Sequence, residues 1–241
     1  MVDYSNLLNK RRSSRHYLDE SFSNQKMEMI KDQLDKLKPL DPKITTRFVI
    51  TDRDKTKAKF GRYSLLAYSE VKPGYLLNIG YMLEQFDLLM NANDIGTCWY
   101  GLAKEDNNLE GLSFVIMIVF GKTEENLNQD RTRINRKSKD LIWQGDFDAR
   151  VKEMVCLAPS AVNSQPWRFI SEKNTINVYR QINYRTFIPI SKRLYFNTID
   201  VGISLCFLEI ALTKLGYNFT RRLIHGESDD EKERLVEYAI L

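Results

Sequence analysis

The segment Ala158–Trp167 reads APSAVNSQPW and joins two predicted elements. Pro159 follows a run with helical spacing and stops that helix. Gln165 precedes Pro166, which favours an extended backbone leading into a strand that begins with Trp167. The short polar side chains and backbone N–H groups between them suit the polar edge of a flat heterocycle, with Trp167 packed behind it. The alternative at this point is an ordinary helix–strand connection with a core tryptophan.

The same succession of elements occurs twice in the chain. Residues 24–120 can be laid over residues 146–241 at an offset of 120 to 122 residues. Both halves then show a helix, a short strand, a long helix and a final strand. The long helices share one spacing of apolar positions: Ile79, Leu83, Phe86 and Met90, then Val201, Leu205, Leu208 and Leu212. Four elements in one order predict a real internal duplication.

The other members of this repeat are shorter. They are the helices 27–37 and 151–157, the first strands 47–50 and 168–170, and the final strands 114–120 and 235–240. The special residues are divided between the halves, since only the first half has RRSSR at residues 11–15 and only the second has APSAVNSQPW. One composite site therefore fits better than two.

Composition excludes several classes of protein. The 241 residues carry a formal net charge of +4, and most charges are mixed in sign. The basic clusters at 11–15 and 131–139 are too short for a nucleic acid but suit a small phosphate. The longest apolar run, 114–120, is far shorter than the ~20 residues of a membrane span, and the N-terminus is polar where a signal peptide is apolar. We expect a cytoplasmic protein with no nucleic-acid or membrane partner.

Cysteine and histidine provide little material for catalysis. His16 and His225 are the only histidines, too few for a histidine-rich metal centre, and no paired acidic motif suggests a metal. The three cysteines, Cys98, Cys156 and Cys206, are widely spaced in apolar surroundings, which is typical of buried reduced thiols. We predict no metal site and no catalytic side chain.

The basic motif is the first candidate site. Arg11, Arg12 and Arg15 with Ser13 place several donors within five residues, and the planar guanidinium group matches phosphate oxygens two at a time. A solvated basic turn or a kinase recognition site is the alternative for this motif alone. Arg136 and Lys137 belong to the second basic cluster, which is either a further phosphate contact or a solvated loop.

A third candidate is the stretch 93–101, NDIGTCWYG, which we expect to end the first long helix. Gly96 would let the backbone approach a ligand closely. A simple helix cap is the alternative.

Together these segments resemble the FMN-dependent nitroreductase family. Its members open with an RRSxR-like motif and an aromatic residue, as in Arg11–Tyr17. They carry an [AS]PSxxNxQPW turn, which Ala158–Trp167 matches almost unaltered, and a GLGTCW-like segment, which Asp94–Trp99 matches. A basic pair such as Arg136-Lys137 follows the last core strand. The turn is highly specific, the other motifs support it, and the resemblance covers most of the chain.

The resemblance implies the cofactor and its contacts. Arg11, Arg12, Ser13 and Arg15 would hold the FMN phosphate, assisted by Arg136 and Lys137. Gly96 and Thr97 would face the flavin ring from below. The ring would be lined, with Gln165 supporting the turn, by Pro159, Ser160, Ala161 and Asn163. NADH or NADPH would supply electrons, and the protein would act as an oxidoreductase on a nitroaromatic, a quinone or a similar acceptor.

One departure from the family indicates a fused dimer. Family members place the turn a few tens of residues after the basic motif and complete the site with a partner chain, whereas here Pro159 lies 147 residues after Arg12. The resemblance then implies an α+β, nitroreductase-like fold of two tandem α/β repeats, in which mainly antiparallel sheets are flanked by helices. The halves 1–140 and 141–241 would intertwine into one globular unit, an internal pseudo-dimer with one FMN per chain, and the protein would be a monomer.

Three alternatives stay open at this level. The chain is a non-enzymatic FMN-binding or sensing protein, it belongs to a branch of the superfamily that removes halogen or fragments flavin, or it is a flavin-free relic. The acceptor pocket is expected in the loops 57–73 and 183–197. Sequence does not distinguish NADH from NADPH.

Overall fold

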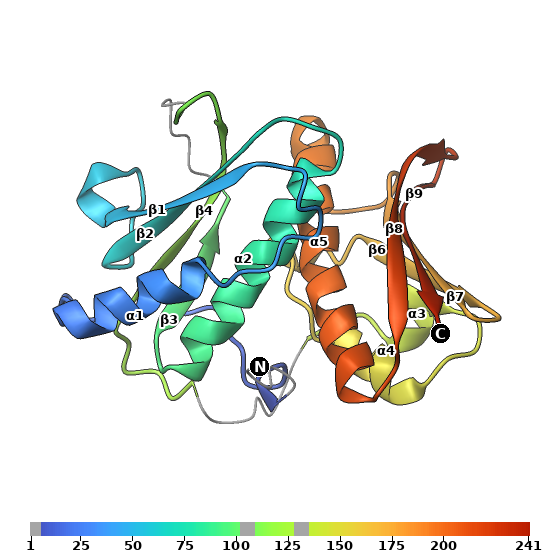
Figure 1. Ribbon diagram of the computed structural model, residues 1–241, viewed down its shortest axis with the longest axis horizontal. Helices are drawn as coiled ribbons and strands as arrows, with labels where there is room; N and C mark the ends of the chain where they lie inside the picture. The colour runs from blue at the N-terminus through green and yellow to red at the C-terminus, as the bar shows by residue number, and fades with distance from the viewer. Residues whose placement is uncertain (1–5, 102–108, 128–134) are drawn as a thin grey trace. The chain divides into compact units, whose positions relative to one another are not determined.

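The computed structural model describes residues 6–101, 109–127 and 135–241. The chain divides into two compact units (Figure 1). One unit is Asn9–Thr132, and the other consists of Met1–Leu8 with Arg133–Leu241. These bounds differ from the expected halves 1–140 and 141–241, because the first eight residues belong with the C-terminal unit. Each unit is described by itself. The expectation that the halves intertwine stays a prediction.

The Asn9–Thr132 unit is an antiparallel sheet with two helices. Its strand order is β1-β2-β4-β3, and all neighbours pair antiparallel. The elements in chain order are α1 (Asn24–Leu34), β1 (Thr46–Asp52), η2 (Arg53–Lys55), β2 (Tyr63–Ser69), α2 (Tyr75–Ala92), β3 (Gly96–Tyr100) and β4 (Ser113–Gly121).

The second unit repeats this plan with an additional edge strand. Its order is β5-β6-β7-β9-β8, antiparallel except for the parallel pair β5 and β6. The elements are α3 (Lys139–Ile142), β5 (Trp143–Gln144), α4 (Ala149–Cys156), η3 (Ala161–Asn163), β6 (Trp167–Glu172), β7 (Thr175–Gln181), α5 (Ile190–Lys214), β8 (Phe219–Ser228) and β9 (Lys232–Ile240).

The two units share one topology. Helix, two strands, long helix and two strands follow in each, and the sheet order β1-β2-β4-β3 has the same connectivity as β6-β7-β9-β8. Each sheet also has a register shift in its β2–β4 or β7–β9 pairing, after Ala67 and after Val178 respectively. The prediction of an α+β fold with mainly antiparallel sheets flanked by helices is confirmed.

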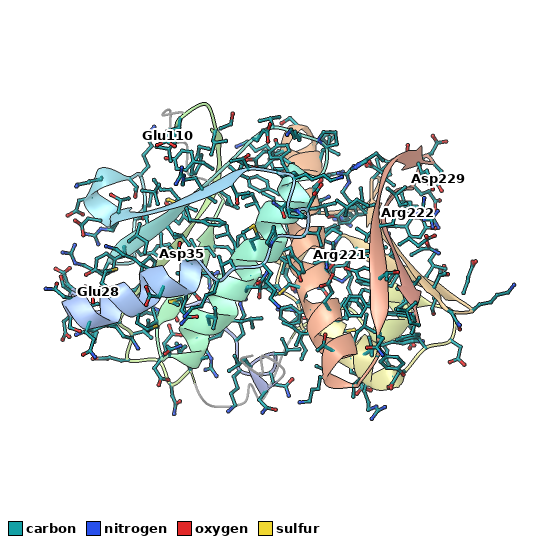
Figure 2. All side chains as sticks on the ribbon, in the orientation of Figure 1. Glu28, Asp35, Glu110, Arg221, Arg222 and Asp229 are labelled. Atoms are coloured by element: carbon teal, nitrogen blue, oxygen red, sulfur yellow. The ribbon has the colours of Figure 1, made fainter. Side chains whose placement is uncertain are left out.

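Local sequence explains where the helices begin and which side they bury. Ser23 caps α1 by accepting a hydrogen bond from the Lys26 amide, and Ile30 on α1 is buried. Glu28 and Asp35, labelled in Figure 2, are exposed on the same helix. By contrast, α2 and α5 are apolar around most of their circumference and are buried along most of their length. They form the helical cores of their units.

Helix α5 is also long and apolar enough to cross a membrane by length and composition. However, 78% of its most apolar window is buried in the structure, as in the core helix of a soluble protein. It packs on α4, β6 and β7 of its own unit. Burial within the fold therefore accounts for its composition.

Two expectations about local structure were wrong. Gly96 and Thr97 do not end the long helix: α2 stops at Ala92, and the chain reverses through Asp94, whose φ is 55°, into strand β3. The residues Thr-Cys-Trp-Tyr favour this outcome because they are β-formers that pair with β4. The expected acceptor loop 57–73 contains the fully buried strand β2, and the loop 183–197 includes the first turns of α5.

The three cysteines all lie among the described residues and form no disulfide. Cys98 and Cys206 are buried, whereas Cys156 is half-buried. Burial raises the pKa of the Cys98 thiol above its ordinary value, so it stays protonated at neutral pH.

Candidate functional site

The turn between α4 and β6 has an unusual backbone. Val162, Asn163 and Gln165 have φ values of 47°, 56° and 47°, in the left-handed region that costs L-residues energy. The extended backbone expected of Gln165 before Pro166 was therefore wrong. Internal hydrogen bonds hold this conformation: the amide of Gln165 donates to Ser160 Oγ at 2.9 Å, and the amide of Asn163 donates to the Ser160 carbonyl at 3.0 Å. A strained, braced turn of this kind is typical of a functional position.

The surroundings of the turn agree with the sequence in two respects. Helix α4 ends at Cys156, shortly before the buried Pro159, and β6 begins at Trp167. Trp167 is fully buried, and within the described part of the chain its indole N–H has no hydrogen-bond partner. Trp167 is therefore a core residue at the start of β6, and its place behind a bound ring stays a prediction.

The structure brings the second basic cluster onto this turn. Arg136 Nη1 donates to Asn163 Oδ1 at 2.9 Å, and the Lys137 amide donates to Gln165 Oε1 at 2.8 Å. Lys137 Nζ donates to the carbonyls of Ser164 at 2.8 Å and Gln165 at 3.2 Å. Arg136 and Lys137 therefore fasten the turn. Residues 131–134 of the predicted basic cluster lie outside the described residues.

The side-chain amides complete the fastening. Gln165 Nε2 donates to both the carbonyl and the Oδ1 of Asn163 at 3.2 Å, while Asn163 Nδ2 donates to the Asn135 carbonyl at 3.1 Å. Val162, at the tip, is 60% exposed. The side-chain amides of Asn163 and Gln165 therefore form hydrogen bonds that stabilise the turn itself, and its tip at Val162 is exposed to solvent.

Three cationic side chains contact the turn. Arg136, Lys137 and Arg168 all donate to its atoms or to adjoining carbonyls. Burial, together with the charge of Arg168, lowers the pKa of Lys137 to about 8. This arrangement suits a ligand edge that accepts hydrogen bonds and carries negative charge.

Asp200 is a residue of this site that the sequence analysis missed. It lies on α5, is 3% exposed, and its Oδ1 accepts from the Ala161 amide at 3.0 Å. Ser164 Oγ donates to Asp200 Oδ2 at 3.4 Å. Burial raises the pKa of Asp200 to about 7, although both hydrogen bonds act to lower it. An available signal was the presence of two acids, Asp200 and Glu209, within the apolar run of α5.

The first basic motif lies in the other unit, and its arginines have different environments. Arg11 is 4% exposed, and its Nε donates to Asp87 Oδ2 at 2.8 Å. A second guanidinium nitrogen bonds the same oxygen, and Glu84 Oε1 lies 3.8 Å from Nε. Arg11 therefore belongs to a buried ion-pair cluster in which its donors face α2.

Asp87 is the centre of that cluster. Its carboxylate also accepts from Trp99 Nε1 at 3.0 Å, from Asn91 Nδ2 at 3.1 Å and from Thr97 Oγ1. Thr97 is thus buried with its hydroxyl occupied. The acids of α2 are the second signal that the sequence analysis missed, since a buried carboxylate in an apolar helix requires partners.

The segment Arg12–Ser14 lies beside the start of β3, which begins at Gly96. The Arg12 amide donates to Asn91 Oδ1 at 3.2 Å, Ser13 pairs with Thr97 as an isolated parallel bridge, and the Ser14 amide donates to the Thr97 carbonyl at 2.8 Å. The motif is extended here and does not lead directly into a helix, because α1 begins only at Asn24.

Close approach at Gly96 gives a testable prediction. A Cβ at this position would lie 2.9 Å from both Cβ and Oγ of Ser14 and 3.1 Å from Thr123 Cγ2. We expect Gly96→Ala to lower the free energy of unfolding by about 1–3 kcal/mol, as overpacking does. Urea unfolding measures this change. A midpoint equal to that of the unmodified protein would show that the segment moves aside without cost.

Arg15 has an open environment. With His16, Arg53 and Lys59 it lines a cavity of about 300 Å³, and Tyr17 and Phe60 stack beside it with centroids 6.1 Å apart. Within the described residues, the side chains of Arg15, His16 and Lys59 make no hydrogen bond or ion pair. Arg15 thus lies with two further cations at the cavity, and its predicted anion contact stays a prediction; Arg53 and Lys59 were not predicted.

The predicted site residues accordingly form two sets. Arg11, Arg12, Ser13, Arg15, Gly96 and Thr97 lie in the Asn9–Thr132 unit. The other set lies in the second unit and comprises Arg136, Lys137, Pro159, Ser160, Ala161, Asn163 and Gln165. The residues of each set lie within one unit.

Comparison with known proteins shows a related family and fold. A family model described as "Putative TM nitroreductase" matches residues 3–212. The fold resembles a crystal structure from Thermotoga maritima, described as a "putative nitroreductase", with a TM-score of 0.63 and 19% identity over 100% of this chain and 93% of that chain. No curated protein matches the chain.

Two further structures are less similar. A nitroreductase in complex with FMN from Desulfovibrio desulfuricans, also called putative, has a TM-score of 0.45 and 16% identity over 61% of this chain and 99% of that chain. A nitroreductase with bound FMN from Desulfitobacterium hafniense has a TM-score of 0.44 and 12% identity over 59% of this chain and 97% of that chain.

Proposed function

Because the chain belongs to this nitroreductase family, we propose that it is an FMN-dependent oxidoreductase with one FMN per chain. Two electrons would pass from NADH or NADPH to a nitroaromatic, a quinone or a similar acceptor. The observation that carries the proposal is the turn at 160–165, which is strained, braced by Arg136 and Lys137, and contacted by a third cation, Arg168.

The turn fits the ring of a flavin. The pyrimidine edge of isoalloxazine accepts and donates hydrogen bonds and gains negative charge when the ring is reduced. The exposed tip at Val162 offers backbone polar groups, and the cations Arg136, Lys137 and Arg168 offset negative charge. In this proposal Asn163 and Gln165 hold the turn in shape.

The basic motif fits the phosphate of FMN. The Arg15 side chain makes no hydrogen bond or ion pair in the described part of the chain and faces a cavity of about 300 Å³. Ser13 lies two residues before Arg15 and pairs with Thr97. We propose Arg12, Ser13 and Arg15 as the phosphate contacts. Arg11 is assigned the structural role of pairing with Asp87, because its donors are directed at that carboxylate.

FMN, when bound, would supply the redox chemistry, since it can accept a hydride from NADH or NADPH and pass the electrons on to the acceptor. The protein's residues would bind and orient the cofactor, offset its charge and exclude water. We assign no protein side chain as general acid or base.

The shared topology of the two units supports a fusion of two ancestral subunits. The unit that carries the basic motif lacks an APSxxNxQPW turn, and the unit that carries the turn lacks an RRSxR motif. We propose that the chain binds one FMN and that a homodimer is not required for binding.

Titration tests the proposal. The purified apoprotein is titrated with FMN and followed by quenching of flavin fluorescence, and the loaded protein is then assayed for NADH and NADPH oxidation with a quinone acceptor. Saturable binding of one FMN and acceptor-dependent oxidation are expected. Binding of FMN without turnover of either nicotinamide would contradict the enzyme and favour a sensing role.

Asn163→Ala isolates the role of the turn. The change removes the acceptor for Arg136 and Gln165 and places alanine at a φ of 56°, so we expect about 10-fold or greater loss of FMN affinity, at ~1.4 kcal/mol per tenfold. Asn183→Ala is the matched control, since that exposed amide makes its hydrogen bond to Asp230 in the same unit. Equal FMN affinity in both variants would remove the turn from the site.

A further inference from the structure

Helix α5 contributes a buried carboxylate to the turn that no motif includes. Asp200 Oδ1 accepts from the Ala161 amide at 3.0 Å, and its Oδ2 faces Ser164 Oγ at 3.4 Å. The two contacts grip the turn at both ends of the left-handed pair Val162 and Asn163. The turn is thus fastened on one side by Arg136 and Lys137, and on the other by Asp200.

We infer that Asp200 is a positioning residue, which fixes the conformation of the 160–165 turn and thereby the polar groups offered to the flavin ring. The inference about the ring rests on the proposed function. The inference about the turn rests only on the hydrogen bonds within the second unit.

Because Asp200 is buried, the hydrogen bonds that it accepts from Ala161 and Ser164 depend on pH. Desolvation by burial raises the pKa of Asp200 to about 7, so the acid is largely protonated at pH 6 and ionised at pH 8. In the unfolded chain it ionises in the ordinary range of an aspartate, near pH 4. Between these values the folded state holds a proton that the unfolded state releases. Stability from this group is therefore complete below about pH 4 and is lost as pH rises to about 7.

Other ionisable groups near this part of α5 come from several elements. Tyr184 OH donates to Asn197 Oδ1 on α5, and burial, with a smaller contribution from the charge of Asp200, raises the pKa of Tyr184 above its ordinary value. The cations around the turn and this helix include Arg136, Lys137, Arg168 on β6, Arg180 on β7, which bonds Thr198, and Arg193 on α5 itself. Lys137 and Tyr184 titrate above Asp200, so of these two groups and Asp200 it is Asp200 that titrates between pH 5 and 7.5.

Two substitutions at Asp200 separate the effect of its hydrogen bonds from the effect of its negative charge. Asp200→Asn keeps an oxygen for the Ala161 amide and places an NH2 group toward Ser164, which mimics the protonated acid. Asp200→Ala removes both contacts. Ser204→Ala is the matched control, because Ser204 is buried on the same helix and donates to the carbonyl of Val201 within it.

The experiment has two readouts in the full-length protein. The first is hydrogen exchange of the Ala161 amide, and the second is FMN affinity between pH 5.5 and 8. We expect Asp200→Ala to raise the exchange rate at Ala161 at least 10-fold and to weaken FMN binding at least 10-fold. Asp200→Asn should retain slow exchange and bind FMN within about 3-fold of the unmodified protein at pH 6. Ser204→Ala should change neither readout.

The pH profile of unfolding provides a third measurement. The thermal midpoint of the unmodified protein should fall between pH 5 and 7.5 more steeply than that of Asp200→Asn, which has no carboxyl to ionise. Parallel profiles would overturn the pH dependence.

The outcomes distinguish this inference from the proposed function. Unchanged Ala161 exchange in Asp200→Ala overturns the positioning role, whatever the FMN result. If the unmodified protein binds no FMN, the proposed function fails, while the exchange measurement still tests Asp200. If FMN binds equally to the unmodified protein and to Asp200→Ala, Asp200 does not position the turn for the flavin, and the proposed function stands.

Discussion

Alanine at both Arg12 and Arg15 should weaken FMN binding by two to four orders of magnitude and leave the fold intact. A hydrogen bond to a charged group contributes about 1.5–3 kcal/mol, so the loss of two corresponds to about 3–6 kcal/mol. The Arg15 side chain makes no hydrogen bond or ion pair in the described residues. The hydrogen bond from Arg12 to Asn91 uses the backbone amide, which alanine retains, although the long side-chain bond from Arg12 Nε to the Lys10 carbonyl, at 3.4 Å, is lost. Equilibrium titration with FMN, with circular dichroism to monitor the fold, measures the effect.

Arg47→Ala is the control for charge. Arg47 lies in the same unit, its side chain is 58% exposed, and it pairs with the exposed Glu110, which is labelled in Figure 2. The control removes one positive charge at a surface pair of little energetic value. FMN retention by Arg12→Ala/Arg15→Ala equal to that of Arg47→Ala would remove the phosphate assignment.

Asp87→Ala should lower the free energy of unfolding strongly. The carboxylate is fully buried, and its removal leaves the buried Arg11 without its main partner and deprives Trp99 and Asn91 of an acceptor. Breaking a buried ion pair from one side costs about 3–5 kcal/mol. We expect a loss of that size in the free energy of unfolding, measured in urea.

The matched control for this prediction is Asp35→Ala. Asp35 is an exposed acid at the C-terminal end of α1, so its replacement should change stability by less than about 0.5 kcal/mol. If Asp87→Ala were as stable as Asp35→Ala, the cluster around Arg11 would not support the unit, and the structural assignment of Arg11 would be wrong.

Much of the architecture could be predicted from apolar periodicity. The long helices and the strands 114–120 and 235–240 were predicted because their spacing or continuity is distinctive, and they correspond to α2, α5, β4 and β9. Strand β2 was missed because its residues, YSLLAYS, are buried on both faces and do not alternate. The strand at Gly96–Tyr100 was missed because a glycine after a helix is typical of a cap.

The candidate site was predictable where it is local in sequence. The turn at 158–167 carries its own proline, asparagine and glutamine signals, and its position between α4 and β6 is confirmed. Asp87 and Asp200 act through partners 76 and 36 to 39 residues away. Periodicity does not encode these pairings. Acids within apolar helices do indicate that each buried carboxylate has a partner, but the sequence does not identify that partner.

The visible absorbance spectrum of the purified protein, with flavin content per chain and native mass, tests the central claim most directly. The account predicts a yellow monomer with one FMN per chain, either as isolated or after addition of FMN. Two FMN per chain would contradict the single composite site. A colourless protein that also refuses added FMN would contradict the flavoprotein assignment and leave a nitroreductase-like fold without that chemistry.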